Sequence, residues 1–164
     1  MVTAARAVAE SVTDPELPML SLADLGVLRE VAEEGGRVVV SITPTYTGCP
    51  ALDTMRDDLV HALQRAGYPD VEVRTVLHPA WSSDWITAEG RRKLAEAGIA
   101  PPGRAPRRRP GPVPLTLAPP PADVRCPRCG SAETERVSEF GATACRALLR
   151  CRSCREPFEH VKEI

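Results

Sequence analysis

The fold of the first half of the chain follows from residues 37–66, which read RVVVSITPTYTGCPALDTMRDDLVHALQRA. The apolar run at 38–42 is typical of a strand, and a loop with two prolines and a glycine follows at 43–50. Beyond this loop, apolar residues recur at helical spacing, which predicts a helix over 51–66 that ends at Gly67. The apolar stripe of this helix consists of Leu52, Met55, Leu59 and Leu63.

The flanking segments complete a small module of helices and strands. Helix-forming residues predict a helix over 3–12, and alternating apolar residues predict strands over 27–31 and 71–76. The sequence Glu-Gly-Gly-Arg at 34–37 is typical of a hairpin turn, and a further helix is expected over 87–97. The order helix, strand, strand, helix, strand predicts an α+β fold, a small sandwich with its helices on one face.

The loop before the second helix is a candidate site because it contains Cys49. Pro50 suits the first helical position, so Cys49 is expected at or beside the N-cap, where backbone amides and the helix dipole favour a thiolate. A small buried cysteine that only packs is the alternative. Asp14 and Glu16 flank a proline in another loop. They can converge on Cys49 as hard ligands or a base, or they are solvated turn residues.

Both tryptophans of the chain, Trp81 and Trp85, lie within five residues near the end of this module. They can form an exposed docking surface, because tryptophan is enriched at interface hot spots. The other interpretation is that they cover a core that is poor in aromatic residues. The sequence favours this second interpretation.

The composition changes at about residue 100. Residues 1–100 hold 9 basic and 15 acidic side chains, whereas residues 101–164 hold 12 and 7. Nine of the seventeen prolines fall between 101 and 121, together with four arginines, which predicts an extended linker. We therefore expect an α+β domain at 1–99, a Pro/Arg-rich linker at 100–122 and a second module at 123–164. The linker arginines are Arg104, Arg107, Arg108 and Arg109.

The second module contains two cysteine pairs with metal-ligand spacing. Cys126 and Cys129 form one C-x2-C knuckle, and after 21 further residues Cys151 and Cys154 form another. Four thiolates in this pattern match tetrahedral Zn²⁺, so we expect a β-rich zinc ribbon whose metal is structural. A rubredoxin-like iron site is the alternative. Cys145 lies outside this quartet, as an inert residue, an alternative ligand or a thiol that works with Cys49.

The ribbon is expected to contain strands within 134–138 and 147–150. Phe140 and Phe158 are the expected core residues of the ribbon. A segment of about forty residues buries too little apolar surface to fold alone, so the metal would hold it together.

Length and composition exclude several classes of protein. The chain has 164 residues, a net charge of −1, 43% hydrophobic and 4% aromatic residues. Collagenous and fully disordered classes are excluded. No apolar run approaches the ~20 residues of a membrane span, and the start lacks a signal-peptide pattern, so we expect a cytoplasmic protein that binds no membrane. Nucleic acid is not an expected partner, because the basic segments lack interleaved aromatic residues and the first module is acidic.

Four ordered motifs, together with the ribbon, resemble a known family. They are Asp14-Pro15-Glu16, Asp24-Leu25-Gly26, residues 43–50 with Cys49, and residues 79–86 with both tryptophans. The chain resembles the PaaD-type subunit of the phenylacetyl-CoA epoxidase (phenylacetate-CoA oxygenase) system. The N-terminal part of that subunit belongs to the wider metal-sulfur cluster biosynthesis domain family.

The resemblance implies an accessory subunit in aerobic phenylacetate degradation rather than the oxygenase itself. In that system the hydroxylating component is a di-iron helical complex and the reductase carries flavin and a [2Fe-2S] cluster. The motif cysteine of the wider family corresponds to Cys49, which would handle iron or a labile iron-sulfur cluster with Asp14 and Glu16 as polar partners and Cys145 as a further candidate. No catalytic residue is implied.

Three hypotheses about function follow. In the first, the protein assists assembly, delivery or repair of the iron or iron-sulfur centres of the oxygenase, with Cys49 as a labile site and the ribbon for docking. In the second, it is a structural subunit that bridges oxygenase and reductase. In the third, Cys49 and Cys145 form a redox dithiol. Because one cysteine cannot complete a cluster site, a homodimer or a protein partner would supply the other ligands.

Overall fold

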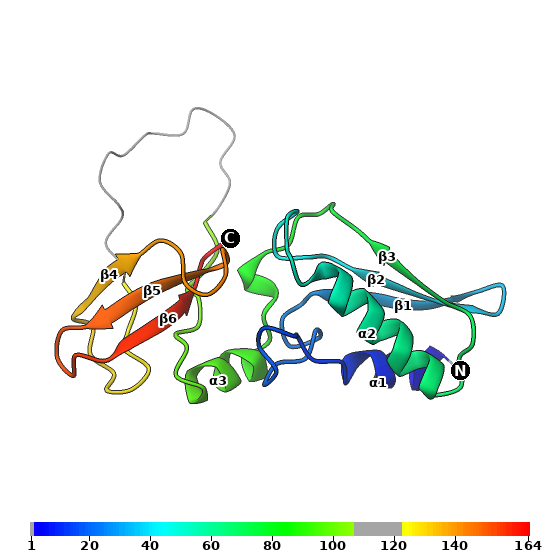
Figure 1. Ribbon diagram of the computed structural model, residues 1–164, viewed down its shortest axis with the longest axis horizontal. Helices are drawn as coiled ribbons and strands as arrows, with labels where there is room; N and C mark the ends of the chain where they lie inside the picture. Colours follow the sequence, from blue (N-terminus) through cyan, green and yellow to red (C-terminus); the bar gives the residue numbers. More distant parts are fainter. Residues whose placement is uncertain (1, 107–122) are drawn as a thin grey trace, which may run out of the picture. The chain divides into compact units, whose positions relative to one another are not determined.

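The computed structural model describes residues 2–106 and 123–164, which divide into two compact units, Met1–Lys93 and Leu94–Ile164 (Figure 1). The Pro/Arg stretch with Arg107, Arg108 and Arg109 lies outside the described residues. Each unit is built around its own three-stranded sheet.

The sheet of the first unit has the strand order β1-β2-β3, formed by Leu28–Glu34, Arg37–Ile42 and Val71–Thr75. Strands β1 and β2 are antiparallel and are joined by a two-residue turn. Gly35 and Gly36 in this turn both have positive φ, 59° and 88°. A type I′ turn requires this conformation at both positions, so the two glycines fix the hairpin register.

Two helices cover one face of this sheet, α1 (Val2–Glu10) and α2 (Leu52–Arg65) (Figure 1). Strand β3 pairs with β2 in parallel, so α2 is the crossover between two neighbouring parallel strands. The predicted stripe of α2 is largely confirmed, because Met55, Leu59 and Leu63 are buried whereas Leu52 is half-buried. The predicted order of helices and strands in this module is confirmed.

The segment between α1 and β1 and the tryptophan segment pack on each other. Trp81 is buried and donates its indole N–H to the carbonyl oxygen of Leu25 at 2.9 Å. Gly26 has φ 68°, and a Cβ there would lie 2.6 Å from the Cβ of Trp85. The Arg29 guanidinium stacks 3.7 Å from the Trp85 ring centroid. The core interpretation is therefore correct for Trp81, and Trp85 is engaged by its neighbours in the same unit.

A 3₁₀ turn at Ser83–Trp85 and helix α3 (Ala88–Glu96) follow. The second unit begins within α3 and contains the sheet β4-β5-β6, formed by Thr134–Ser138, Arg146–Cys151 and Pro157–Val161. Its strands are antiparallel. The residues that form its buried cluster are Ala100, Val124, Cys126, Ala147, Leu149, Cys151 and Phe158.

The prediction that both phenylalanines belong to the ribbon core is confirmed for Phe158 and wrong for Phe140. The side chain of Phe140 is 66% exposed, because the chain leaves β4 at Ser138 beyond an irregular register step and carries Phe140 outward. The ammonium of Lys162 lies 4.5 Å from its ring centroid. Strand β6 was not among the expected strands.

The start of the predicted linker is paired with the ribbon. Ala100 forms a parallel bridge to His160. The N–H of Ala100 donates to the Glu159 carbonyl oxygen at 2.8 Å, and its carbonyl oxygen accepts the N–H of Val161 at 3.1 Å. The N–H of Gly103 donates to Glu163 Oε1 at 2.8 Å. Ala100 therefore forms a single backbone bridge to β6, and Gly103 is held by the side chain of Glu163.

Candidate functional site

Two knuckles bring the four ribbon cysteines together. Their Sγ atoms all lie within 4.8 Å of one another, with 3.8 Å between Cys126 and Cys154 and 3.6 Å between Cys129 and Cys151. Pairing of β4 with β5 positions the second knuckle, because Cys151 is itself the last residue of β5 and lies opposite Thr134. The four sequence-predicted ligands thus converge at one point.

The geometry of this cluster fits zinc. Tetrahedral ligands at a Zn–S distance of about 2.3 Å have S–S separations of about 3.8 Å, which matches the two separations found across the knuckles. Zinc bound there would be held by four thiolates and would leave no coordination position for a substrate. Its contribution is therefore structural, holding the two knuckles together.

The knuckles are also joined by hydroxyl contacts beside the sulfur cluster. The hydroxyl groups of Ser131 and Ser153 lie 2.8 Å apart, one from each knuckle. Glu133 accepts a hydrogen bond from Ser153, and its carbonyl oxygen accepts the N–H of Arg152 at 2.8 Å. These contacts orient the ligand loops around the sulfurs.

The protein environment shifts the pKa values of two of the four thiols, those of Cys151 and Cys154, in opposite directions. The backbone N–H of Cys154 lowers the pKa of Cys151 to about 6, against the opposing effect of burial. For Cys154 itself, an N–H from Glu156 lowers the pKa, but burial and the other three sulfurs outweigh it and raise the pKa to about 12. Because metal ligation requires thiolates, loading the site at neutral pH releases protons.

Cys49 lies in the loop between β2 and α2. Its N–H donates to the Tyr46 carbonyl oxygen at 3.2 Å, and its carbonyl oxygen accepts the N–H of Leu52 at 3.2 Å. Helix α2 begins at Leu52 with Ala51 as its N-cap. The prediction that Pro50 is the first helical residue is therefore wrong by two positions, because a separate turn closed by Cys49 precedes the helix. Cys49 is half-buried.

Asp14 is a turn residue whose carboxylate binds the backbone of its own loop. Its side chain is buried, and its Oδ1 accepts the N–H groups of Glu16 and Leu17, both at 2.8 Å. Its own N–H donates to the Leu20 carbonyl oxygen. The turn interpretation was thus correct in kind, although Asp14 is buried rather than solvated. Among the described residues, Asp14 and Glu16 form no metal-ligand group with Cys49.

Cys145 lies outside the quartet, within a polar network. Its Sγ is 3.0 Å from Thr143 Oγ1, which also accepts a hydrogen bond from Arg146 Nε at 3.0 Å. Arg146 is buried and pairs with Glu159 at 2.7 Å. The Arg146–Glu159 ion pair was not predicted, since its members are distant in sequence and belong to different strands.

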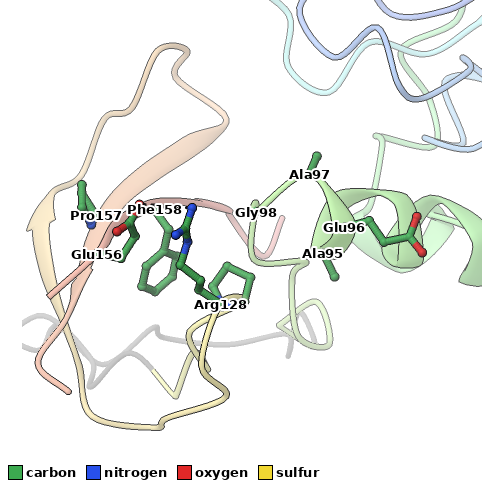
Figure 2. A pocket seen from close by; sticks show the side chains of 9 residues that line it. Ala95, Glu96, Ala97, Gly98, Arg128, Glu156, Pro157 and Phe158 are labelled. Carbon is green, nitrogen blue, oxygen red and sulfur yellow. Dashed lines mark ion pairs between the residues drawn. The ribbon is translucent and has the colours of Figure 1, made fainter. Parts of the chain in front are cut away.

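A hollow on the second unit lies beside the first knuckle. It is lined by the last turn of α3, by Pro127 and Arg128 of the knuckle and by the start of β6. Figure 2 shows Arg128 and Glu156 at this hollow, where their charged groups lie 3.6 Å apart. In the parts of the chain that the structure describes, no helix is long and apolar enough to cross a membrane.

Comparison with known proteins assigns both units. Residues 3–77 match the family model described as iron-sulfur cluster assembly protein, and residues 111–162 match the PaaD zinc beta ribbon domain. A solved structure from Bacillus anthracis, of a domain of unknown function termed DUF59, has a TM-score of 0.52 and 27% identity, covering 57% of this chain and 90% of that one.

Two curated relatives extend the comparison. A Porphyromonas gingivalis (strain ATCC BAA-308 / W83) Fe-S protein maturation auxiliary factor is 30% identical over 86 residues, which are 51% of this chain and 81% of that protein. A protein of Escherichia coli (strain K12), named as a subunit of 1,2-phenylacetyl-CoA epoxidase, is 43% identical over 156 residues, which are 95% of this chain and 89% of that relative. The chain therefore belongs to the PaaD family of phenylacetyl-CoA epoxidase subunits, with an iron-sulfur assembly domain followed by a zinc ribbon.

Proposed function

We propose that this protein assists assembly, delivery or repair of the iron or iron-sulfur centres of a phenylacetyl-CoA epoxidase in aerobic phenylacetate degradation. The proposal is supported by the match of residues 3–77 to an iron-sulfur assembly family and by the relatives named as a phenylacetyl-CoA epoxidase subunit and as an Fe-S maturation factor. In this function the protein is an accessory subunit without catalytic activity of its own.

Cys49 carries the proposal, because it is the one cysteine between residues 3 and 77. The four ribbon sulfurs are gathered at one centre, and the sulfur of Cys145 contacts Thr143 in the other unit. Cys49 is half-buried in a loop that precedes a helix whose N-cap has no side-chain hydrogen bond. Cys49 lies two residues before this N-cap, and as a thiolate it would be a ligand for iron or a cluster.

A single thiolate holds its cargo only with help from other ligands, because iron-sulfur clusters need several. In the proposed mechanism, these ligands come from the client protein or from a second copy of this chain. Asp14 contributes by shaping the turn at 14–17 through the N–H groups that its carboxylate accepts. Incomplete ligation by this chain suits transfer, since the cargo leaves when the client offers a full set of ligands.

The experiment compares wild type with Cys49→Ser, purified without oxygen and reconstituted with iron and sulfide. Cys145→Ser is the matched control, because it removes a half-buried cysteine that is also outside the quartet. Iron, acid-labile sulfide and zinc are measured on each protein. We expect zinc in all three, and substoichiometric iron and sulfide that only Cys49→Ser lacks.

The second measurement is maturation of the epoxidase components when they are coexpressed with each variant. We expect Cys49→Ser to reduce the cluster content of the client and Cys145→Ser to leave it unchanged. Full client activity with Cys49→Ser would instead favour the non-catalytic subunit that bridges oxygenase and reductase. A reversible disulfide lost equally in both variants would favour the dithiol hypothesis.

A further inference from the structure

The two metal-binding knuckles differ at one equivalent position. In the first, Cys129 is followed by Gly130 with φ 74°, and in the second, Cys154 is followed by Arg155 with φ 65°. Both residues therefore adopt the left-handed conformation as the chain turns away from the cluster. Arg155 is the one residue other than glycine with positive φ among the described residues.

This conformation is unfavourable for an arginine. A Cβ approaches the following carbonyl oxygen when φ is positive, whereas glycine avoids the contact. The first knuckle shows that glycine fits such a turn, and nothing lies within 4 Å of a Cβ built on Gly130. A residue kept in this conformation at the expense of stability is a candidate for a function of its side chain.

Arg155 lines a small open pocket next to the cluster. The pocket has a volume of about 330 Å³ and is lined by Glu135, Arg150, Cys151, Arg152 and Arg155. Glu135 Oε1 accepts hydrogen bonds from Arg150, and its Oε2 accepts one from Arg152 Nε at 3.0 Å. Two guanidinium groups thus pair with one carboxylate, and Arg155 adds a third positive charge to the pocket lining, which leaves an excess of positive charge.

The charge of Arg155 is the one left unbalanced. Among the described residues, no hydrogen bond or ion pair engages its guanidinium, whereas Arg150 and Arg152 both pair with Glu135. The guanidinium fork matches the two oxygens of a carboxylate, and Glu135 shows that this surface already binds one. A second carboxylate placed beside Arg155 would complete the arrangement.

We propose that Arg155, together with Arg150 and Arg152, is a docking site for an acidic segment of a partner protein. Arg150 and Arg152 already hold the carboxylate of Glu135, which shows that guanidinium groups of this pocket pair with carboxylate oxygens. Side chains exposed by 58% and 66% at Arg150 and Arg152 bind single small anions weakly. A segment with several carboxylates contacts all three arginines at once.

This inference rests on the proposed function and deepens the docking role that the first hypothesis gives the ribbon, and it is tested separately from Cys49. Binding of a fluorescein-labelled oligoglutamate peptide to the zinc-loaded full chain is measured by anisotropy at low salt. The variants are Arg155→Gly, Arg155→Asn and the control Arg128→Ala. Asparagine tolerates positive φ, and Arg128 is an exposed arginine of the other knuckle that pairs with Glu156.

We expect Arg155→Gly and Arg155→Asn to weaken peptide binding about two- to fivefold, while Arg128→Ala binds as wild type does. Arg155→Gly should also retain zinc and melt a few degrees higher, because it removes the unfavourable conformation. Weaker peptide binding together with a higher melting temperature in Arg155→Gly would show that the Arg155 side chain serves binding rather than stability.

Two results would overturn the proposal. They are peptide binding by Arg155→Gly equal to wild type and an equal loss in Arg128→Ala. Cys49→Ser should bind the peptide normally. If Cys49→Ser still holds iron, the proposed function fails at Cys49 while the docking site stands on the Arg155 results.

Discussion

Neutralising Glu159 should destabilise the ribbon far more than neutralising a similar surface carboxylate. The side chain of Arg146 is 7% exposed, and its Nη1 donates to Glu159 Oε2 at 2.7 Å. The other oxygen of Glu159 accepts the N–H of Ala142 at 2.8 Å. Glu159→Gln preserves the shape of the side chain but leaves a buried guanidinium without its counter-charge.

The expected magnitude follows from burial. Removing one partner of a buried ion pair costs about 3–5 kcal/mol, whereas an exposed pair contributes about 0–1 kcal/mol. The matched control is Glu139→Gln in the same unit, because Glu139 is 53% exposed and pairs with Arg136 at 2.8 Å. Since metal binding and folding of small zinc domains are coupled, the loss should appear as weaker zinc binding by roughly 150- to 5,000-fold.

The assay is competition for zinc with a chromophoric chelator, followed on the full chain at neutral pH. Circular dichroism of the metal-free and zinc-loaded proteins checks that metal loss and ribbon unfolding coincide. Equal zinc affinity for Glu159→Gln and Glu139→Gln, within a factor of about three, would refute the argument that burial makes this ion pair important.

Three further predictions concern the same chain. Gly26→Ala should prevent the first unit from folding, as seen by loss of its helical circular dichroism, because a Cβ would lie 2.6 Å from Trp85 Cβ at a φ of 68°; a soluble variant with native melting would contradict this. Phe140→Ser should leave the free energy of unfolding and zinc content nearly unchanged, since the ring is 66% exposed; a loss of zinc would restore Phe140 to the core. Hydrogen bonds from the guanidinium groups of Arg74 and Arg37 lower the pKa of Glu72 to about 2, so the stabilisation it provides should be present above about pH 4.5 and disappear as the pH falls toward 2. Carboxyl NMR titration measures this, and a midpoint near 4.5 would contradict it.

Local sequence patterns were sufficient to predict features that depend on residues only a few positions apart. The apolar stripe of α2 and the spacing of the four ribbon cysteines depend on residues a few positions apart, so periodicity and ligand spacing located them. The turn at 34–37 was equally predictable, because glycine adopts the positive φ that both central positions require.

Features that depend on contacts made only in the folded chain could not be predicted from the sequence. Strand β6 carries the polar residues Glu159 and His160 on opposite faces, so neither face is apolar throughout. Its position becomes clear only from its pairing with β5, the ion pair with Arg146 and the bridge at Ala100. Phe140 looked like a core residue by its side chain alone, yet the path of the chain after β4 decides its exposure. Whether Asp14 was a ligand or a turn residue depended on backbone amides that its sequence neighbours supply only once folded.

Because Cys151 belongs both to β5 and to the sulfur cluster, metal binding depends on correct pairing of β4 with β5. Cys151 is a residue of β5 that lies opposite Thr134, and its sulfur is 3.6 Å from that of Cys129. Successive side chains of a strand face opposite ways, so a slip of one residue between β4 and β5 would turn the sulfur away from its three companions. A misaligned hairpin would then lack a complete ligand set, and the ion would selectively retain chains whose strands have paired correctly.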